Sequence, residues 1–256
     1  MPSEGNKAAI EVKGLDKHFG PIHAVRNVSF SVNYGDVLGF LGPNGAGKST
    51  TMKMISGFLE PSGGSVTVNG HDVMDDPITV KTNIGYLPEG APSYGEMSVI
   101  HFLNFIAEIR GFNGVEKQAR IDNVVKQINL ASVLTQTIET LSKGFKRRVG
   151  VAQAILHDPG VLIMDEPTDG LDPNQKHEVH TLIREMARNK AIIISTHILD
   201  EVDAVCNRAI IIAAGRILFD GSPSELRSQS DINDLDDAFR RITTDFYREE
   251  GGAVQS

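Results

Sequence analysis

Short apolar runs separated by turn residues characterise roughly the first ninety positions of the chain. The glycines between the runs, such as Gly35, Gly63 and Gly70, are typical of turns rather than of helix interiors. The pattern therefore predicts strands at Ile10–Val12, Val28–Val32, Val37–Leu41, Ser65–Val68 and Ile84–Leu87.

A helical spacing of apolar residues replaces this pattern between Ser98 and His157, where Phe102, Phe105 and Ile109 recur on one face. Continuous apolar runs return afterwards, and such runs are typical of parallel strands buried on both faces. These runs lie at Val161–Met164, Ala191–Ser195 and Ala209–Ala213, with helical stretches at Asn174–Asn189 and Ile198–Val205 between them.

Strands from both parts of the chain are expected in one sheet, because Val37–Leu41 precedes the helical segment and Val161–Met164 follows it. The pattern thus predicts an α/β fold in which helices flank a parallel sheet and the helical insert forms its own lobe. Further along, the spacing of Leu235, Phe239 and Ile242 predicts one short amphipathic helix, followed by a polar, mobile end.

Composition narrows the class of protein. Hydrophobic residues make up 40% of the 256 positions and charged residues 23%, as in a globular domain, and the formal net charge of −8 argues against nucleic acid as the main partner. A single cysteine, Cys206, excludes an intramolecular disulfide and fits a reducing compartment. No apolar run approaches the ~20 residues of a spanning helix, and the first eight residues show no targeting pattern. We therefore expect a cytoplasmic protein whose membrane role depends on a partner.

The clearest chemical signal is Gly42-Pro43-Asn44-Gly45-Ala46-Gly47-Lys48-Ser49, which fits the phosphate-binding pattern G-x-x-x-x-G-K-[ST]. It stands between a predicted strand and the helical stretch Thr50–Ile55, as such a loop requires. Glycines let successive backbone N–H groups converge on phosphates, Lys48 reaches the β- and γ-phosphates, and Ser49 ligates Mg²⁺.

Two acids follow the apolar run Val161–Met164, at the carboxyl end of a strand, where α/β sheets place their ligands. Asp165 is predicted to hold Mg²⁺, and Glu166 to orient or polarise the attacking water. His197 follows the run Ala191–Ser195 in the same way, so it is either a contact to the γ-phosphate and the water or a structural histidine.

A second anion site is predicted at Leu141–Phe145, which opens the helix expected at Lys146–His157. Ser142 and the backbone N–H groups at this helix start could bind phosphate. Alternatively, Ser142 caps the helix and does nothing more.

Taken together, these segments resemble the nucleotide-binding domains of ABC ATPases. The segments that carry the resemblance are Gly42–Ser49, Leu141–Phe145, Val161–Glu166, Gly170–Asp172 and Ser195–His197, within a stretch from about Ile10 to Phe219. The resemblance implies an α/β fold with a P-loop NTPase core and parallel sheet, an N-terminal antiparallel β subdomain and a helical signature subdomain. It implies a domain over residues 8–228, with a helical insert at about 90–158, and a tail at 229–256.

Functional roles follow from the same resemblance. Two such domains would sandwich two ATP molecules, with Ser142, Lys143 and Gly144 of one chain contacting the nucleotide held by the other. Asp172 would belong to the loop that links the two sites, and His197 would be the switch histidine. Phe19 would stack on adenine, although a place in the core is the alternative for this ring. Thr50 would join the phosphate loop in binding ATP.

Two positions depart from the usual family pattern. Glu89 stands where most relatives carry glutamine, and it can accept a hydrogen bond from a metal-bound water or ligate Mg²⁺, but it cannot donate as an amide can. Lys143 stands where glycine is usual, and its side chain either points to solvent or reaches the phosphates across the dimer. Both departures, with the tail Leu235–Phe239, resemble the exporter branch that serves small six-helix permeases, and within it the gliding-motility-type ATP-binding subunits.

These observations predict an ATPase that uses ATP and Mg²⁺, forms a homodimer and passes its motion to a separate integral membrane permease through the surface near Glu89–Met97. Such a protein would lie on the inner face of the cell membrane. Three alternatives remain: a soluble ABC ATPase without a transport role, a small-molecule kinase that uses the same phosphate loop, and a nucleotide-binding regulatory module without turnover.

Overall fold

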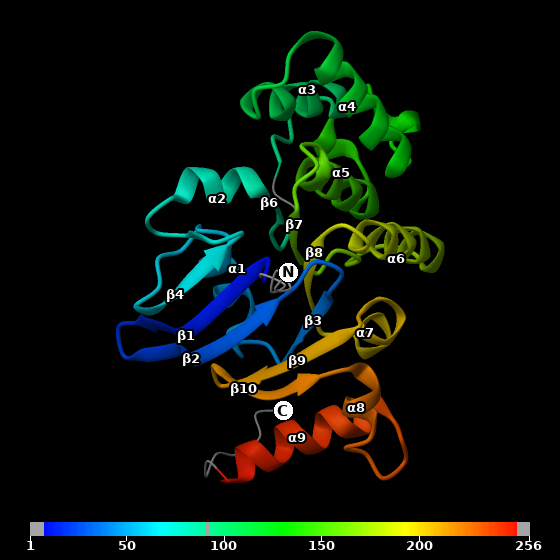
Figure 1. The fold of residues 1–256 in the computed structure, drawn as a ribbon. Coiled ribbons are helices and arrows are strands. Elements are labelled where there is room, and N and C mark those ends of the chain that lie inside the picture. The colour runs from blue at the N-terminus through cyan, green and yellow to red at the C-terminus, as the bar shows by residue number, and fades with distance from the viewer. Residues whose placement is uncertain (1–7, 91–92, 250–256) are drawn as a thin grey trace, which may run out of the picture.

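The computed structural model describes residues 8–90 and 93–249, which fold into two sheets and flanking helices (Figure 1). An antiparallel sheet has the order β2-β1-β4-β5, and a larger, mostly parallel sheet has the order β10-β9-β3-β8-β7-β6. The antiparallel sheet consists of β1 (Ile10–Phe19), β2 (Ile22–Val32), β4 (Gly63–Val68) and β5 (His71–Asp72). The larger sheet consists of β3 (Val37–Leu41), β6 (Ile84–Leu87), β7 (Val161–Asp165), β8 (Ala191–Thr196), β9 (Arg208–Ala213) and β10 (Arg216–Gly221).

Helices cover the larger sheet and build a separate lobe, which lies at the top of Figure 1 and contains α3, α4 and α5. The lobe helices are α3 (Val99–Ile109), α4 (Gly114–Gln127) and α5 (Lys143–Ile155), with short 3₁₀ turns at Ala131–Val133 and Ile138–Thr140. The remaining helices are α1 (Lys48–Ile55), α2 (Pro77–Asn83), α6 (Pro173–Ala187), α7 (Leu199–Val205), α8 (Pro223–Arg227) and α9 (Leu235–Glu249). The predicted α/β fold, with its antiparallel strands, parallel sheet and helical insert, is confirmed.

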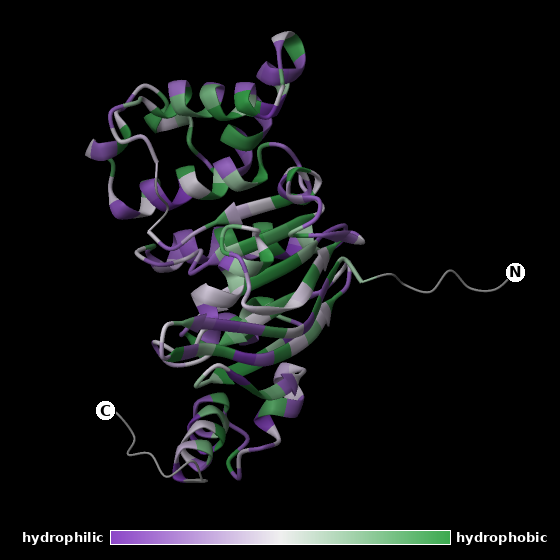
Figure 2. Cartoon of the chain, turned by 90° about the vertical axis from the view of Figure 1, so that its left-hand side faces the viewer, coloured by the Kyte–Doolittle hydropathy of each residue, from purple (hydrophilic) through white to green (hydrophobic). Residues whose placement is uncertain are grey.

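Both faces of the parallel sheet are buried, which explains the continuous apolar runs of the sequence. Side chains alternate between the faces of a strand, so Leu162 and Met164 of β7 pack in a core shared with the helical lobe. Val161 and Ile163 of the same strand pack in a second core with α1 and the antiparallel sheet. Figure 2 shows hydrophobic residues concentrated along these central strands.

A third, smaller core joins the last helices to β9 and β10. Leu235 and Ala238 of α9 are buried there, and Phe239 and Ile242 pack against them. The predicted helix after residue 231 is confirmed, although with 15 residues it is longer than expected. The mobile end predicted to follow it falls on residues 250–256, which lie outside the described residues.

Several elements differ from the sequence prediction. Strand β1 continues to Phe19 and β2 begins at Ile22, whereas only Ile10–Val12 and Val28–Val32 were expected. Register shifts along this pair break the alternation on which the prediction relied. The edge strand β10 and the short helices α2 and α8 were missed, because edge strands and helices of one or two turns bury too few side chains for a clear period.

The lobe of α3, α4 and α5 contacts the parallel sheet where α5 approaches β6. A Cβ atom built on Gly85 of β6 would lie 2.1 Å from the carbonyl oxygen of Ala154 and 2.6 Å from Cδ2 of Leu162. The first contact is with helix backbone, which cannot move without moving the whole of α5. The missing side chain of Gly85 therefore sets the distance between the lobe and the sheet.

We expect Gly85→Ala to destabilise the protein by about 1–3 kcal/mol, because overpacking of a close contact forces the backbone to shift. Gly63→Ala is the matched control, since a Cβ at this strand glycine would meet only Asp16 Cβ, at 3.6 Å. Urea unfolding of both variants measures the difference. Equal unfolding midpoints would contradict the close approach at Gly85.

Candidate functional site

The loop between β3 and α1 needs its glycines for two separate reasons. Gly45 and Gly47 adopt positive φ values of 77° and 105°, which side-chain-bearing residues avoid. A Cβ on Gly42 would stand 2.2 Å from the carbonyl oxygen of Ile212 on β9. The backbone can curl over the start of α1 only because these side chains are absent. The loop predicted from the sequence thus has the conformation that exposes backbone N–H groups to phosphate.

Lys48, the first residue of α1, is buried with 8% of its surface exposed. Its Nζ donates hydrogen bonds to the carbonyl oxygens of Gly42 at 2.6 Å and Pro43 at 3.0 Å. Burial lowers the pKa of Lys48, and the negative charges of Asp165, Glu166 and Glu89 oppose that change. The structure thus brings the predicted phosphate-binding cation into the electrostatic range of all three predicted acids.

Asp165 ends β7 as a buried carboxylate, and only one of its two oxygens accepts a hydrogen bond from the described part of the chain. Its Oδ1 accepts a hydrogen bond from Ser195 Oγ of β8, while its Oδ2 is buried and has no partner among the described residues. An unsatisfied buried carboxylate oxygen is costly, and a divalent cation would satisfy it. The Asp165 Oδ2 atom and the Ser49 hydroxyl are oxygen ligands of the type that Mg²⁺ prefers.

Glu166 and His197 meet directly in the structure. Nδ1 of His197 lies 2.7 Å from Oε1 of Glu166 and donates a hydrogen bond to it. Glu166 has a φ of 50°, in the left-handed region that a residue with a long side chain rarely occupies, and its N–H donates to the carbonyl oxygen of Ser195 at 3.0 Å. Strained backbone of this kind clusters at functional sites. Of the two alternatives for His197, the hydrogen bond to Glu166 favours a contact to the γ-phosphate and the water over a purely structural histidine.

Three residues of this site were not singled out in the sequence. Ser195, which donates to Asp165, was predicted as part of a strand and of the segment Ser195–His197, but no role was predicted for it. The hydroxyl of Tyr86 on β6 is buried without a partner among the described residues, and burial, then Asp165 and Glu89, raise its pKa to about 12. The Tyr86 hydroxyl is therefore protonated, and it can donate a hydrogen bond near Asp165 and Glu89.

Glu201 of α7 is the third missed residue, and it connects the loops that carry Glu166 and His197. Its carboxylate, in a residue only 5% exposed, accepts hydrogen bonds from the hydroxyls of Thr168 and, at 2.9 Å, Thr196. Lys176 of α6 pairs with it at 3.2 Å. The only signal in the sequence was an acid among the apolar residues of a short helix, which does not identify partners so distant in the chain.

The predicted second anion site forms the start of α5. Ser142 is exposed and caps the helix by accepting a hydrogen bond from the N–H of Phe145 at 3.3 Å. Lys143 has helical backbone, so glycine is not needed at this position. Its side chain is 72% exposed, and its Nζ forms an ion pair with Asp169 Oδ2 of the same chain at 2.8 Å. This partner was not expected from the sequence, and a contact of Lys143 with phosphates across a dimer stays a prediction.

The remaining predicted residues are Phe19, Asp172 and Glu89. Phe19 ends β1 with 46% of its surface exposed, and Lys17 Nζ stands 5.2 Å above its ring, so the core alternative for Phe19 is wrong. Asp172 caps α6 by accepting from the N–H of Gln175 at 2.9 Å. Glu89 is exposed in the segment after β6. Figure 1 places the start of α5 in the helical lobe, separate from the phosphate loop at α1. The two helix starts predicted to bind phosphate thus lie in different parts of the chain.

Comparison with known proteins agrees with this geometry. A family model described as "ABC transporter" matches residues 25–169. The uncharacterised ABC transporter ATP-binding protein YxlF of Bacillus subtilis (strain 168) is 36% identical over 224 residues, which cover 88% of this chain and 74% of YxlF. The ABC transporter ATP-binding protein NatA of the same organism is 36% identical over 220 residues, which cover 85% of this chain and 89% of NatA.

Solved structures show the same fold. The structure of an ATP-binding subunit of an ABC transporter matches with a TM-score of 0.84 and 31% identity, covering 92% of this chain and 99% of that one. A dimeric post-hydrolysis structure of the ATP-binding cassette MJ0796 with ADP and phosphate matches with a TM-score of 0.77. It covers 83% of this chain and 98% of that one at 21% identity, so it supports the fold alone.

The ion pair between Lys143 and Asp169 generates a prediction about pH. The hydrogen bond from Lys143, followed by its charge, lowers the pKa of Asp169. The pair therefore stabilises the fold above the ordinary pKa of an aspartate, near 4, and this contribution is lost as the pH falls through the lowered pKa. In Lys143→Gln the pKa of Asp169 should rise towards its ordinary value, as measured by NMR titration of the side-chain carboxyl. Lys146→Gln, three positions along α5, is the control and should leave that pKa in place. A pKa of Asp169 that does not respond to Lys143→Gln would show that the ion pair is not formed in solution.

Proposed function

The chain belongs to the ABC transporter family and is an ATP-binding, ATP-hydrolysing protein, and from that premise we propose that it drives a separate integral membrane permease as a homodimer. The observation that carries the proposal is the placement of Lys48, Asp165, Glu166 and His197 at the carboxyl ends of adjacent parallel strands. This placement supports the proposal that phosphate binding, metal binding and water activation occur together at one edge of the sheet.

Phosphate binding begins with an exchange of hydrogen bonds at Lys48. Nζ of Lys48 donates to the carbonyl oxygens of Gly42 and Pro43, which hold the ammonium inside the loop. Phosphate oxygens carry full negative charge and form stronger bonds to an ammonium than neutral carbonyls do. Lys48 then turns to the β- and γ-phosphates, while Gly45 to Thr50 supply backbone N–H groups and the start of α1.

The cation site would be built from Ser49 and Asp165, with Glu89 as a further ligand or as an acceptor for a metal-bound water. Bound Mg²⁺ would neutralise the phosphate charge and orient the phosphates. Ser195 keeps Oδ1 of Asp165 occupied, so that Oδ2 is the oxygen left for the ion. Glu201 braces the neighbouring loops through Thr168 and Thr196.

Water activation falls to Glu166 and His197. A carboxylate that accepts a hydrogen bond from His197 is fixed in direction and keeps its second oxygen available to a water molecule. Glu166 would accept a proton from this water as it attacks the γ-phosphate, and His197 would hold Glu166 in place and contact the γ-phosphate. The Glu166 side chain is 23% exposed and that of His197 57%, so this pair remains open until something covers it.

The geometry suggests that a second copy of the chain covers the exposed pair of Glu166 and His197. The exposed start of α5 at Ser142, with Lys143 and Gly144, would meet the phosphates held by the partner, and Asp172 would lie between the two sites. This arrangement explains why one chain carries two phosphate-binding helix starts that do not face each other. The dimer of a cassette with the same fold is consistent with it.

The permease would dock near Glu89, Tyr94 and Met97. Tyr94 is 58% exposed although its ring packs edge-on against Phe105, with centroids 5.3 Å apart, so a rigid aromatic ring is presented to a partner. Ala91 and Pro92, within the predicted docking surface, lie outside the described residues. None of the helices in the described part of the chain has the length and apolar content that a membrane crossing requires. Through the permease, the protein would lie on the cytoplasmic face of the membrane.

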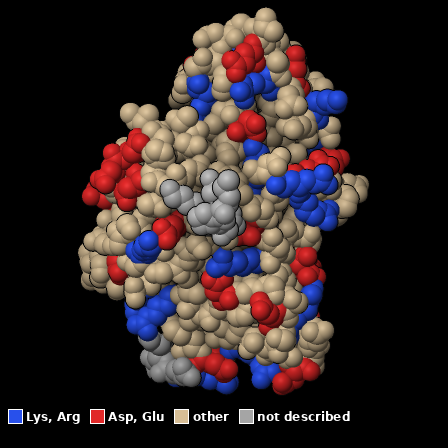
Figure 3. Space-filling view, in the orientation of Figure 1, with Lys and Arg blue, Asp and Glu red and all other residues tan. Residues whose placement is uncertain are grey.

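We assign the protein to the exporter branch, most like the gliding-motility type, on the basis of Glu89, Lys143 and the tail helix α9. The net charge of −8 supports a protein partner rather than nucleic acid. Acidic and basic side chains are interspersed in small groups on the face seen in Figure 3.

Glu166→Gln should reduce ATP turnover by about 10²–10⁴-fold, because the amide cannot accept a proton from water. Binding of ATP should persist, and the variant should accumulate as an ATP-bound dimer in analytical ultracentrifugation. Glu185→Gln, on the exposed side of α6, is the matched control and should retain turnover. Turnover of Glu166→Gln within a few-fold of the unsubstituted protein would remove Glu166 from this role.

Cross-linking tests the docking surface. Burial raises the pKa of Cys206 to about 12, which favours a more exposed cysteine introduced at Tyr94 as the target of a maleimide cross-linker, and the experiment is done in a Cys206→Ser background. Tyr94→Cys should form an adduct with an integral membrane protein, identified by mass spectrometry. Val115→Cys, at a position 88% exposed on α4, should not. Adducts formed by Val115→Cys but not by Tyr94→Cys would show that the permease docks elsewhere than near Tyr94.

A further inference from the structure

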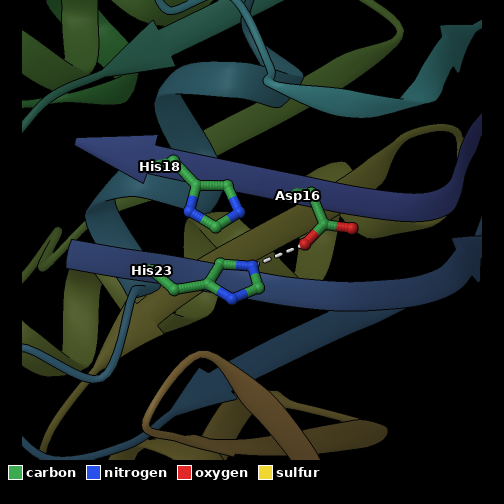
Figure 4. A group of neighbouring side chains, drawn as sticks. All are labelled: Asp16, His18 and His23. Carbon is green, nitrogen blue, oxygen red and sulfur yellow. Dashed lines mark hydrogen bonds and ion pairs between the residues drawn. The ribbon is translucent and has the colours of Figure 1, made fainter. Parts of the chain in front are cut away.

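Three metal-ligating side chains gather on the hairpin of β1 and β2, outside the nucleotide site described above. Asp16, His18 and His23 lie close together on one face of this hairpin, as Figure 4 shows. Their candidate ligand atoms all lie within 4.8 Å of one another. No part of the proposed ATPase mechanism uses them.

The strand pairing explains how the cluster forms. His18 of β1 and His23 of β2 are direct cross-strand partners, and Asp16 lies two residues before His18, in the part of β1 where the register shifts. His23 Nε2 lies 2.6 Å from Asp16 Oδ1, and the two imidazole rings stack with centroids 3.8 Å apart and an angle of 17° between planes. The pairing of His18 with His23 and the hydrogen bond between His23 and Asp16 thus bring the three groups together.

We propose that Asp16, His18 and His23 form a binding site for a divalent transition-metal ion of the Zn²⁺ type. Two imidazoles and a carboxylate form a ligand set that Zn²⁺ and Co²⁺ accept, whereas Mg²⁺ and Ca²⁺ require oxygen ligands. Three protein ligands leave the fourth tetrahedral position to water. Asp16 and His23 are partly buried and His18 is exposed, so an ion reaches the site from solvent.

Metal binding requires two movements. Each imidazole lone pair lies in the plane of its ring, so two nearly parallel rings cannot direct their lone pairs at the same ion. The His18 ring is exposed, and apart from its stacking on His23 it makes no hydrogen bond within the described part of the chain, so it is free to turn. Asp16 Oδ1 and His23 Nε2 are hydrogen-bonded at 2.6 Å, so they must exchange this bond for the ion and move slightly apart. Metal–ligand bonds near 2.0–2.1 Å imply a separation of about 3.3 Å between ligand atoms in a tetrahedral site, within the 4.8 Å that the three groups span.

The site lies where it can affect nucleotide binding. His18 precedes Phe19, the proposed adenine platform, and His23 precedes Ala24, whose carbonyl oxygen would stand 2.7 Å from a Cβ on Gly47 of the phosphate loop. The hairpin also connects to that loop through Gly215, which accepts from Arg26 N–H at 2.8 Å and donates to Ala46 O at 3.0 Å. An ion that ties the two strands together would hold this end of the hairpin in place and raise ATP affinity. This coupling rests on the proposed function, whereas the metal site itself does not.

Metal binding is tested on the full chain without nucleotide. Zn²⁺ titrated by calorimetry should bind at one ion per chain, and Co²⁺ should give the visible absorption of a tetrahedral complex. His23→Ala and His18→Ala should each weaken binding by at least about tenfold, the lower bound seen when even an outer-shell partner is removed. His71→Ala is the matched control, because His71 also pairs with an aspartate, Asp76, at 3.0 Å, but without a second histidine. Circular dichroism confirms that each variant is folded.

Equal Zn²⁺ binding by the unsubstituted protein and the folded double variant His18→Ala/His23→Ala would overturn the site and leave the cluster as a hydrogen-bonded brace of the hairpin.

The coupling is tested by measuring the affinity of the unsubstituted protein and of the double variant for Mg²⁺-saturated ATP, with and without one equivalent of Zn²⁺. Chelation of Zn²⁺ by ATP is the same for both proteins, so a metal-dependent gain confined to the unsubstituted chain supports the coupling, and its absence overturns it. Failure of the unsubstituted protein to bind ATP in the absence of Zn²⁺ would instead contradict the proposed function.

Discussion

Burial of the parallel sheet on both faces is the constraint on which the site depends. Strands β3, β8 and β7 are adjacent and parallel, so their carboxyl ends lie at one edge. Neither face has room for polar groups, and the chemistry is therefore confined to the residues where these strands end. Lys48 follows β3 through its loop, Asp165 ends β7, and His197 follows β8. Ser195 pairs in register with both Phe40 and Asp165, which brings the phosphate loop and the acids to the same level.

Charge balance explains why the site is incomplete without its ligands. Asp165, Glu166 and Glu89 surround a loop whose ligand is itself a polyanion. Two buried cations, Lys48 and Arg147, interact with these acids, and burial lowers the pKa of both. ATP can enter such a site at reasonable cost only with a divalent cation, which would also satisfy the orphaned Oδ2 of Asp165. The exposed pair of Glu166 and His197 then needs cover, which a second chain would supply. Metal, nucleotide and dimer are thus expected to assemble together rather than independently.

Much of this arrangement could be predicted from the sequence, because local rules determine it. The phosphate loop, the acids at the end of β7 and the cap at Ser142 each depend on a few consecutive residues. Contacts between distant segments could not be predicted in the same way. The partners of Glu201, the ion pair of Lys143 with Asp169 and the cluster at His18 and His23 all depend on register or on helix packing. The strand pair β1 and β2 was underestimated for the same reason, since its register shifts appear only when both strands are placed.

The central claim is that the nucleotide site is completed in trans, by Ser142 and its neighbours from a second chain. Mixing two differently tagged chains, one carrying Asn44→Cys in the phosphate loop and one carrying Lys143→Cys at the start of α5, tests this most directly. With a short thiol cross-linker, ATP and the additional substitution Glu166→Gln, a covalent species that contains both tags should appear, and it should disappear without ATP. A cross-link that forms instead within one chain carrying both cysteines at high dilution, with no doubly tagged species, would contradict the account.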